Sequence, residues 1–217
     1  DGYGGSDAST VSVTVENSPP EVSSISITPA TGVKTNSRLV SSATATDPDG
    51  GSPTLTYRWT SGSTTLGNTA TLALTPGTAS PGDRIVCTAT ATDTGGDTGS
   101  ANTAVTVENT DPVIDRIEIR PTTAVYNDST LSCAVNATDL DGSAPSIAYT
   151  WTNETTGTTL GSTSTLVLTS SSASPNDTIR CSAEASDSDG GSVTQFTDRT
   201  LENRAPSLKP VNNTPAT

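Results

Sequence analysis

The 217-residue sequence contains no histidine and no methionine, and its 10 Lys and Arg residues face 23 Asp and Glu. Histidine is the commonest general base and the commonest transition-metal ligand, so its absence disfavours enzymes and zinc sites. The formal net charge of −13 disfavours nucleic acid as a partner, because binding to phosphates needs Lys and Arg. The same excess of carboxylates is compatible with hard cations such as Ca²⁺.

Long apolar runs are also missing, and aromatic residues are few. No run of about 18 apolar residues occurs, so we expect no membrane insertion. With one Phe, two Trp and four Tyr, the chain has few side chains for an aromatic binding platform, which makes a ligand-binding accessory module the least favoured class. No nucleophile stands beside a base, and we expect the chain not to be an enzyme.

Threonine and serine are abundant, with 43 Thr and 30 Ser. Such a composition occurs in disordered, glycosylated stalks. Here, however, threonine alternates with Val, Leu and Ala, as in residues 11–15 and 71–75. Alternation with a period of two among β-branched residues predicts strands that carry threonine on their solvent face.

The sequence repeats itself at the length of one domain. Glu16-Asn17 returns as Glu108-Asn109 and as Glu202-Asn203, at intervals of 108 − 16 = 92 and 202 − 108 = 94 residues. A period of this length matches one β-sandwich rather than a solenoid turn. We therefore predict four segments: the final strand of a preceding repeat (1–17), repeat 1 (18–109), repeat 2 (110–203), and a linker or first strand of a following repeat (204–217).

Each repeat divides into about seven short alternating segments separated by turn residues, and no helical period is found. This pattern predicts an all-β fold of tandem immunoglobulin-like β-sandwiches with about seven strands each. Both tryptophans, Trp59 and Trp151, fall at inward positions of the third strand. The final strand of repeat 2, roughly residues 194–201, is the weakest, because Arg199 stands where repeat 1 has Val105.

The order Cys133, Trp151, Cys181 resembles an immunoglobulin core. The segments 108–114 and 137–142 resemble the tandem Ig-like repeats of very large bacterial extracellular proteins, of the PKD, REJ or cadherin-like type. The chain lacks the tyrosine corner of antibody domains and the Trp-x-Phe-Gly-Asp-Gly run of PKD domains. The resemblance implies adhesion or scaffolding and an extracellular or cell-surface location, and it does not name a ligand.

The three cysteines divide into a candidate pair and a single residue. Cys133 and Cys181 fall on inward faces of the second and sixth strands, which oppose each other across such a sandwich, so we expect a disulfide rather than two buried thiols. The counterpart of Cys133 in repeat 1 is Ser41, so we expect Cys87 to be a free, buried thiol.

Acidic residues gather in two loops of each repeat and in the linker before it. In an Ig-like sandwich the loops after the second and sixth strands lie at the end where the chain enters. The candidate ligands are Glu108, Asn109, Asp111, Asp139, Asp141, Asp187 and Asp189 for repeat 2, and Glu16, Asn17, Asp47, Asp49, Asp93 and Asp97 for repeat 1.

Calcium takes about six to eight oxygen ligands from carboxylates, amides and carbonyls. These clusters therefore predict a calcium site at each inter-domain joint. The alternative is that the Asp-Gly sequences are ordinary turns, since Asp caps turns and Gly supplies a positive φ. One sequon, Asn153-Glu154-Thr155, stands at a predicted hairpin tip and is a candidate for N-glycosylation.

The leading interpretation is a structural or adhesive module, in which rod-like tandem repeats extend a large extracellular protein and calcium stiffens the joints. Its partners would be neighbouring repeats or subunits of the same kind, together with a cell-surface or glycan ligand that the sequence does not identify. The alternative is a subunit of an extracellular filament. In that case residues 8–16, with valines on one face, would complete the sheet of a neighbouring chain by strand addition.

Overall fold

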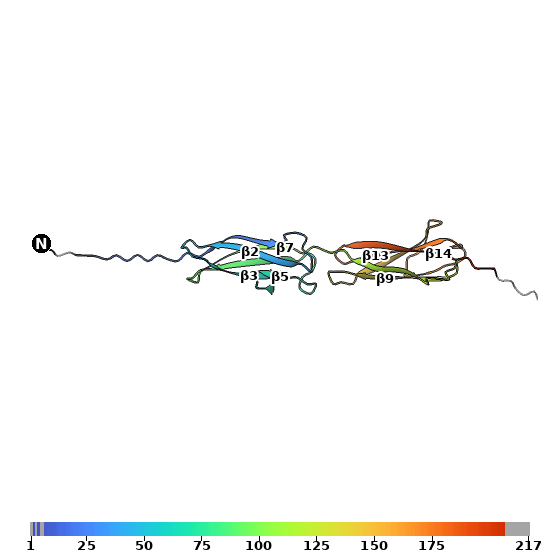
Figure 1. Cartoon of the computed structure of the whole chain (residues 1–217), viewed down its shortest axis with the longest axis horizontal. Helices are drawn as coiled ribbons and strands as arrows, with labels where there is room; N and C mark the ends of the chain where they lie inside the picture. Colours follow the sequence, from blue (N-terminus) through green and yellow to red (C-terminus); the bar gives the residue numbers. More distant parts are fainter. Residues whose placement is uncertain (1, 3, 5–6, 207–217) are drawn as a thin grey trace, which may run out of the picture. The chain divides into compact units, whose positions relative to one another are not determined.

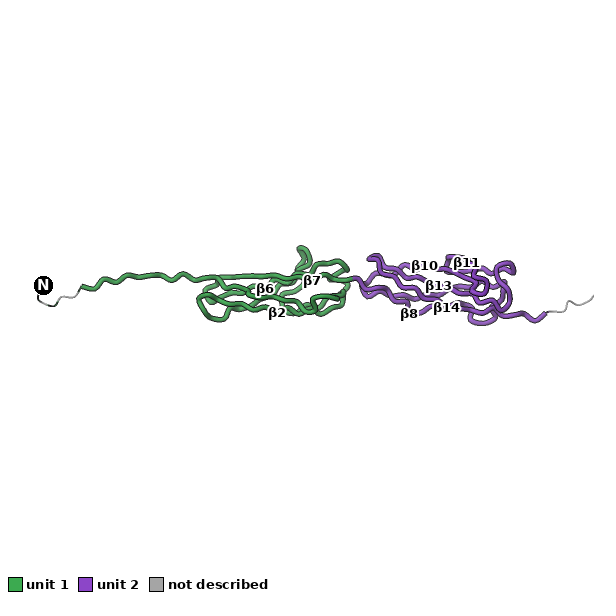
Figure 2. Tube along the Cα trace, turned by 90° about the horizontal axis from the view of Figure 1, so that it is seen from above, with its two compact units in different colours: residues 1–108 green, residues 109–217 purple. Residues whose placement is uncertain are grey.

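The computed structural model describes residues 2, 4 and 7–206. The residues 207–217, for which a following strand was one prediction, lie outside this described part. The chain divides into two compact units, unit 1 (Asp1–Glu108) and unit 2 (Asn109–Thr217), each folded around its own sheets (Figure 2). No helix long and apolar enough to cross a membrane occurs among the described residues.

The described part of unit 1 consists of seven antiparallel strands, which form two sheets (Figure 1). One sheet has the order β1-β2-β5 and the other the order β4-β3-β6-β7. The strands are β1 (Glu21–Thr28), β2 (Arg38–Thr46), β3 (Thr54–Ser61), β4 (Thr64–Gly67), β5 (Thr71–Ala73), β6 (Arg84–Thr92) and β7 (Thr98–Thr106).

Unit 2 repeats this topology strand for strand, with one sheet in the order β12-β9-β8 and the other in the order β11-β10-β13-β14. The strands are β8 (Val113–Arg120), β9 (Thr130–Thr138), β10 (Ser146–Asn153), β11 (Thr158–Gly161), β12 (Thr165–Val167), β13 (Thr178–Ser186) and β14 (Ser192–Thr200). The prediction of tandem immunoglobulin-like sandwiches with about seven strands each is confirmed.

The alternation of the sequence determines which side chains form each core. Along β6, Ile85, Cys87, Ala89 and Ala91 are buried, while the threonines between them are only partly covered. Small alanines on the inward face let the two sheets approach each other closely, and β13 follows the same pattern. Apart from one tryptophan each, the cores are therefore built from small and medium-sized aliphatic side chains and cysteine.

One buried tryptophan fills the centre of each sandwich. Trp59 and Trp151 are both fully buried, and each indole Nε1 donates a hydrogen bond of 2.8 Å to a backbone carbonyl, of Thr69 and Thr163 respectively. Trp59 pairs with Cys87 across β3 and β6, and Trp151 pairs with Cys181 across β10 and β13. The satisfied N–H explains how an indole is accommodated in a core with few other polar groups.

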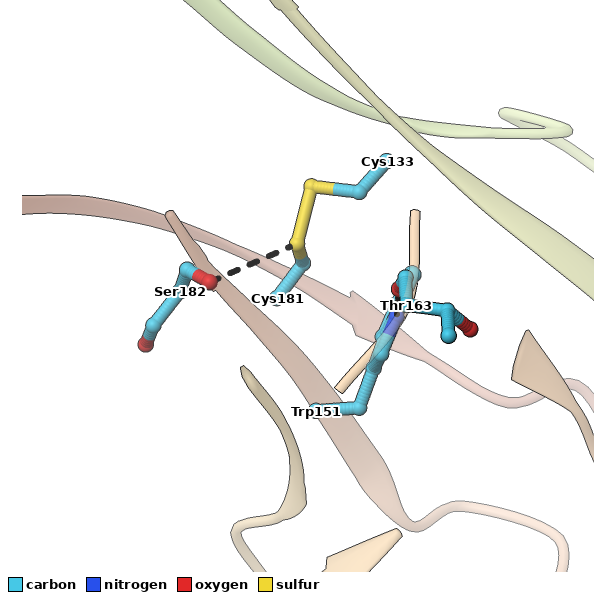
Figure 3. The surroundings of a disulfide bond; sticks show 5 residues. All are labelled: Cys133, Trp151, Thr163, Cys181 and Ser182. Carbon is cyan, nitrogen blue, oxygen red and sulfur yellow. Dashed lines mark hydrogen bonds between the residues drawn. A yellow bond between two sulfur atoms is a disulfide. The ribbon is translucent and has the colours of Figure 1, made fainter. Parts of the chain in front are cut away.

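The predicted disulfide is confirmed. Cys133 on β9 bonds to Cys181 on β13, so the bridge joins the two sheets of unit 2 beside Trp151 (Figure 3). The Cα atoms are 6.4 Å apart, and 48 residues separate the two cysteines in sequence. Closing a loop of this size stabilises a domain by about 3–4 kcal/mol on a chain-entropy estimate.

Unit 1 lacks this bridge. Cys87 is free and buried, as expected, and the buried Ser41 occupies the position that corresponds to Cys133. Burial raises the pKa of the Cys87 thiol, and the nearby Ser41 side chain opposes this effect in part. The thiol therefore stays protonated and behaves as a small core residue.

The substitution Ser41→Cys should create the missing bridge in unit 1. The new thiol would face Cys87 as Cys133 faces Cys181, and we expect the free energy of unfolding of unit 1 to rise by about 3–4 kcal/mol. Urea unfolding with and without reductant measures this gain, which should disappear on reduction. The control is Ser42→Cys, because residue 42 is exposed on the opposite face of β2. If Ser41→Cys and Ser42→Cys changed the free energy of unfolding by the same amount, the inferred register would be contradicted.

Candidate metal centre

The chain enters unit 2 through two residues that bind two different loops. The Asn109 side-chain Nδ2 donates to Asp187 Oδ2 at 2.9 Å, and the Thr110 backbone N–H donates to Asp141 Oδ2 at 2.7 Å. Asp187 follows β13, and Asp141 follows β9. The linker and both acidic loops thus meet at one end of the sandwich, which we call the linker end.

The carboxylates of the linker end also order their own loops. Asp139 Oδ1 accepts the backbone N–H of Asp141 at 2.6 Å. Asp187 Oδ1 accepts the backbone N–H groups of both Asp189 and Gly191 at 2.8 Å. Such bonds are typical of turns built around aspartate, so ordinary turn formation accounts for one oxygen of each of these two residues.

Gly191 allows two carboxylates to approach each other. A Cβ atom at this buried position would collide with Asp187 Oδ2, would lie 2.6 Å from Asp111 Oδ1 and would lie 2.8 Å from Asn109 Nδ2. The side chains of Asp111, from the linker, and Asp187, from the loop, therefore converge over the glycine. Any larger residue at position 191 would push these groups apart.

Turn formation explains only one of the two carboxylate oxygens of Asp139. Its Oδ2 atom is buried and has no hydrogen-bond partner among the described residues. Burial raises the pKa of this carboxyl, and the charges of Asp141, Asp187 and Asp189 raise it further. By contrast, the amide of Asn109 is the main cause of a lowered pKa at Asp187. The cluster thus contains one carboxylate oxygen that would gain from a positive partner.

Unit 1 uses the same scheme at its own linker end. Asn17 Nδ2 donates to Asp93 Oδ2 at 2.9 Å and to Asp97 Oδ2 at 2.8 Å, and the Ser18 backbone N–H donates to Asp49 Oδ2 at 2.5 Å. Asp47 Oδ1 accepts the N–H of Asp49 at 2.9 Å. As at Asp187, hydrogen bonding by the linker asparagine is the main cause of a lowered pKa at Asp93.

The two linker ends differ in the positions at which they carry acidic residues. Pro19 stands in repeat 1 where repeat 2 has Asp111, and Asp97 stands where repeat 2 has Gly191. Unit 1 therefore lacks the carboxylate that the linker supplies in unit 2. Among the described residues of either unit, no three His, Cys, Asp or Glu side chains are arranged to hold a metal ion as they stand.

Two of the candidate ligands do not reach these clusters. Glu108 lies in unit 1, where Oε1 accepts the backbone N–H of Gly32 at 2.8 Å and Oε2 lies 3.7 Å from Lys34 Nζ. Glu16 is exposed and forms no hydrogen bond or ion pair with the described residues. The Glu108 side chain therefore bonds within unit 1, whereas the side chain of the next residue, Asn109, bonds within unit 2.

The proposed glycosylation of Asn153 is contradicted by its burial. The side chain is fully buried, and its Nδ2, the atom that would carry a sugar, donates to Asp177 Oδ2 at 2.7 Å. Its Oδ1 accepts the backbone N–H of Thr155 at 3.1 Å. Asn153 therefore closes the lengthened hairpin from inside, and a glycan could not be attached without opening the fold.

An outward-facing cluster on unit 2 was not anticipated from the sequence. Arg180 forms paired hydrogen bonds of 2.8 Å with Asp198, lies 3.1 Å from Glu154 and stacks 3.8 Å from the centroid of the Phe196 ring. In unit 1 the positions of Arg180 and Asp198 are Val86 and Ala104, which face each other in the same register. The cross-strand register, once assigned, is the signal that could have revealed this pair.

No protein-family model and no curated protein match the chain. Among solved structures it is similar to the three N-terminal domains of the Highly Immunogenic Outer Capsid protein (Hoc) of bacteriophage RB49, with 15% identity over 86% of this chain and 71% of that chain and a TM-score of 0.36. The fibronectin(III)-like modules of Clostridium thermocellum CbhA match with 15% identity over 86% of this chain and 100% of theirs, at a TM-score of 0.34.

A third match is a tetra-tandem repeat from the extending region of a large adhesion protein. It shows 14% identity over 84% of this chain and 49% of that chain, at a TM-score of 0.37. The present chain thus corresponds to about half the length of that structure.

The substitution Asp139→Asn should stabilise unit 2 at pH 7 in EDTA by on the order of 1 kcal/mol. The amide keeps the Oδ1 acceptor for Asp141, removes the repulsion and replaces the buried Oδ2 with a donor. Because the pKa of Asp139 is raised, protonation on lowering the pH relieves the same repulsion in the wild type. The gain in stability from Asp139→Asn should therefore decrease as the pH falls through the pKa of Asp139. Urea unfolding of both proteins at pH 7 and at about pH 3 would measure this decrease.

The matched variant is Asp141→Ala, which removes the acceptor of the Thr110 N–H. It should destabilise unit 2 under the same conditions, because a structural hydrogen bond is lost. If Asp139→Asn destabilised unit 2 as strongly as Asp141→Ala, Asp139 would be only a turn-forming residue.

Proposed function

We propose that the chain is a structural module of a large extracellular or cell-surface protein, in which tandem sandwiches build length. The observation that carries the proposal is the Cys133–Cys181 bridge between the two sheets of a complete sandwich. Such bridges persist in oxidising compartments and are rare in the cytosol. The Thr- and Ser-rich strand faces are typical of a module that remains hydrated along its whole surface.

The repetition of the linker end supports a tandem role. In both units an asparagine just before the first strand donates to the aspartate that follows the sixth strand, and the next backbone N–H donates to the loop after the second strand. Each unit therefore fixes the incoming chain in the same way. The resemblance to PKD-, REJ- or cadherin-like repeats adds support for scaffolding or adhesion outside the cell.

Surface labelling of the source organism tests this proposal. An antibody raised against the folded chain should label intact cells or their secreted material, and mass mapping without reduction should recover the Cys133–Cys181 peptide. Labelling that appears only after cells are permeabilised, together with free Cys133, would contradict an extracellular role. Antibody against a cytosolic protein serves as the control for cell integrity.

We further propose that Ca²⁺ binds at the linker end of unit 2. Carboxylates of Asp111, Asp139, Asp187 and Asp189 and the amide oxygen of Asn109 are the residues that would hold it. The support is the buried, unpartnered Oδ2 of Asp139 and the charge repulsion around it, which a divalent cation would relieve. Unit 1 would form a related site from Asn17, Asp47, Asp49, Asp93 and Asp97.

Calcium should raise the melting temperature of unit 2. For a dissociation constant of about 1 mM, typical of extracellular modules, about 10 mM Ca²⁺ would add roughly 1.4 kcal/mol to the free energy of unfolding. Differential scanning calorimetry in EDTA and in calcium measures the shift, and Mg²⁺ at the same concentration controls for ionic strength.

Two variants separate the site from a general charge effect. Asp139→Asn should abolish the calcium response of unit 2. Asp115→Asn should keep it, because Asp115 lies on the outer face of β8, where it accepts hydrogen bonds from Asn136 and Thr138. Identical melting curves in calcium and EDTA for the wild type would leave turn formation as the whole role of these acids.

A filament subunit assembled by strand addition is a second candidate function. The observation that favours it is the exposure of Val11, Val13 and Val15, at 83%, 84% and 86% of their maximal surface. A row of exposed valines on an extended segment needs a partner, and a neighbouring sheet is one way to supply it.

A further inference from the structure

Residues 8–16 form an extended segment that pairs with no described strand. Its three valines are the most exposed large apolar side chains among the described residues. They alternate with Ser12 and Thr14, which is the pattern of a strand with one buried face. The segment thus has the sequence of a sheet strand without a sheet to cover it.

The same five residues occur a second time in the chain, in a buried setting. Val13–Asn17 reads Val-Thr-Val-Glu-Asn, and so does Val105–Asn109. In the second occurrence Val105 and Val107 are 6% and 1% exposed, at the end of β7 and just after it, within the core of unit 1. The same sequence therefore ends a buried last strand in one place and lies exposed, outside any strand, in the other.

The glutamate of this sequence has a defined role at the end of each complete sandwich. Glu108 Oε1 accepts the N–H of Gly32, and Glu202 Oε1 accepts the N–H of Ala124, at 2.8 Å and 2.7 Å respectively. The backbone N–H of each glutamate also donates into the same sandwich, to the carbonyl of Val33 or Val125. Glu16, the third member of the series, has no such N–H donor for its carboxylate among the described residues.

The segment cannot complete the sandwich of unit 1 itself. β7 already pairs with β6 along its whole length. Moreover, a last strand begins near the linker end and finishes, at its glutamate, at the opposite end. Asn17 is fixed at the linker end by Asp93 and Asp97, and a strand of nine residues is about 30 Å long. Glu16, bonded directly to Asn17, therefore cannot lie at the far end of unit 1.

We infer that residues 8–16 are the last strand of another sandwich of the same type, which precedes unit 1 in tandem. In that sandwich Val13 and Val15 fill the core positions of Val105 and Val107, and Glu16 caps a backbone N–H as Glu108 does. Asn17 then begins the sandwich of unit 1, as Asn109 begins the sandwich of unit 2. This inference does not depend on calcium, and it specifies which surface the exposed valines cover.

A fusion that continues the repeat tests the inference. Residues 18–92, which carry β1 to β6, are joined directly before Asp1 of the full chain, so that Asp1 takes the position of Asp93 and residues 8–16 take that of 100–108. We expect a third folded sandwich, seen as an added unfolding transition. The amides of Val13 and Val15 should exchange at least about 100-fold more slowly than in the unfused chain.

Two double variants of the fusion identify the face that matters. V13D/V15D should abolish the third transition and the protection, because charges would be placed in the core. T10D/T14D adds the same charge on the outward face, where repeat 1 has the exposed Asn102 and Thr106, and should leave both in place.

Other outcomes overturn the inference. If the wild-type fusion showed no third unfolding transition, the segment would not complete this type of sandwich. The same would follow if V13D/V15D and T10D/T14D lost the third transition and the exchange protection equally. If the unfused chain instead formed oligomers that grow with concentration and are lost in V13D/V15D, the strand would be donated to a second molecule, and the tandem assignment would be replaced by strand addition between chains.

Discussion

In each unit, one hydrogen bond joins a linker asparagine to the aspartate after the sixth strand. The arrangement of the linker and of the acidic loops at the linker end depends on this bond. Asn17 makes it to Asp93 in unit 1, and Asn109 makes it to Asp187 in unit 2. The bond fixes where the chain enters, and it therefore also fixes where the carboxylates of the loops and of the linker gather. At the linker end of unit 2, the buried Oδ2 of Asp139 has no hydrogen-bond donor among the described residues. The proposed cation site is a consequence of this arrangement.

The two cores are nearly the same, yet they are held together differently. Each centres on a buried tryptophan surrounded by Val, Leu, Ile and Ala. Unit 2 adds a covalent bond between its sheets, whereas unit 1 has Ser41 and a protonated Cys87 at those positions. Because small aliphatic side chains bury little area per residue, a bridge has a large effect on such a core. Unit 1 is held together by packing and hydrogen bonds, without a covalent bond between its sheets.

Sequence reasoning was sufficient for the sandwiches, because alternation, the repeat period and the Cys-Trp-Cys order each depend on a regular strand geometry. It also placed Asp139, Asp141 and Asp187 in loops that meet. It was wrong about Asn153, since a sequon carries no information on burial: Asn153 lies two residues after the buried Trp151 on β10, on the same inward face, and bonds to Asp177. The sequence also could not show that the Glu108 side chain bonds within unit 1, because adjacent residues at a domain boundary can bind to different units.

The linker end of unit 2 is proposed to bind a cation, in addition to forming turns. A high-resolution crystal structure of the chain grown in about 10 mM calcium tests it most directly. We expect a cation bound to Asp139 Oδ2, with further oxygens from the carboxylates of Asp111 or Asp187. A well-ordered linker end with no cation, in which Asp139 Oδ2 meets only water or a protein donor, would contradict it.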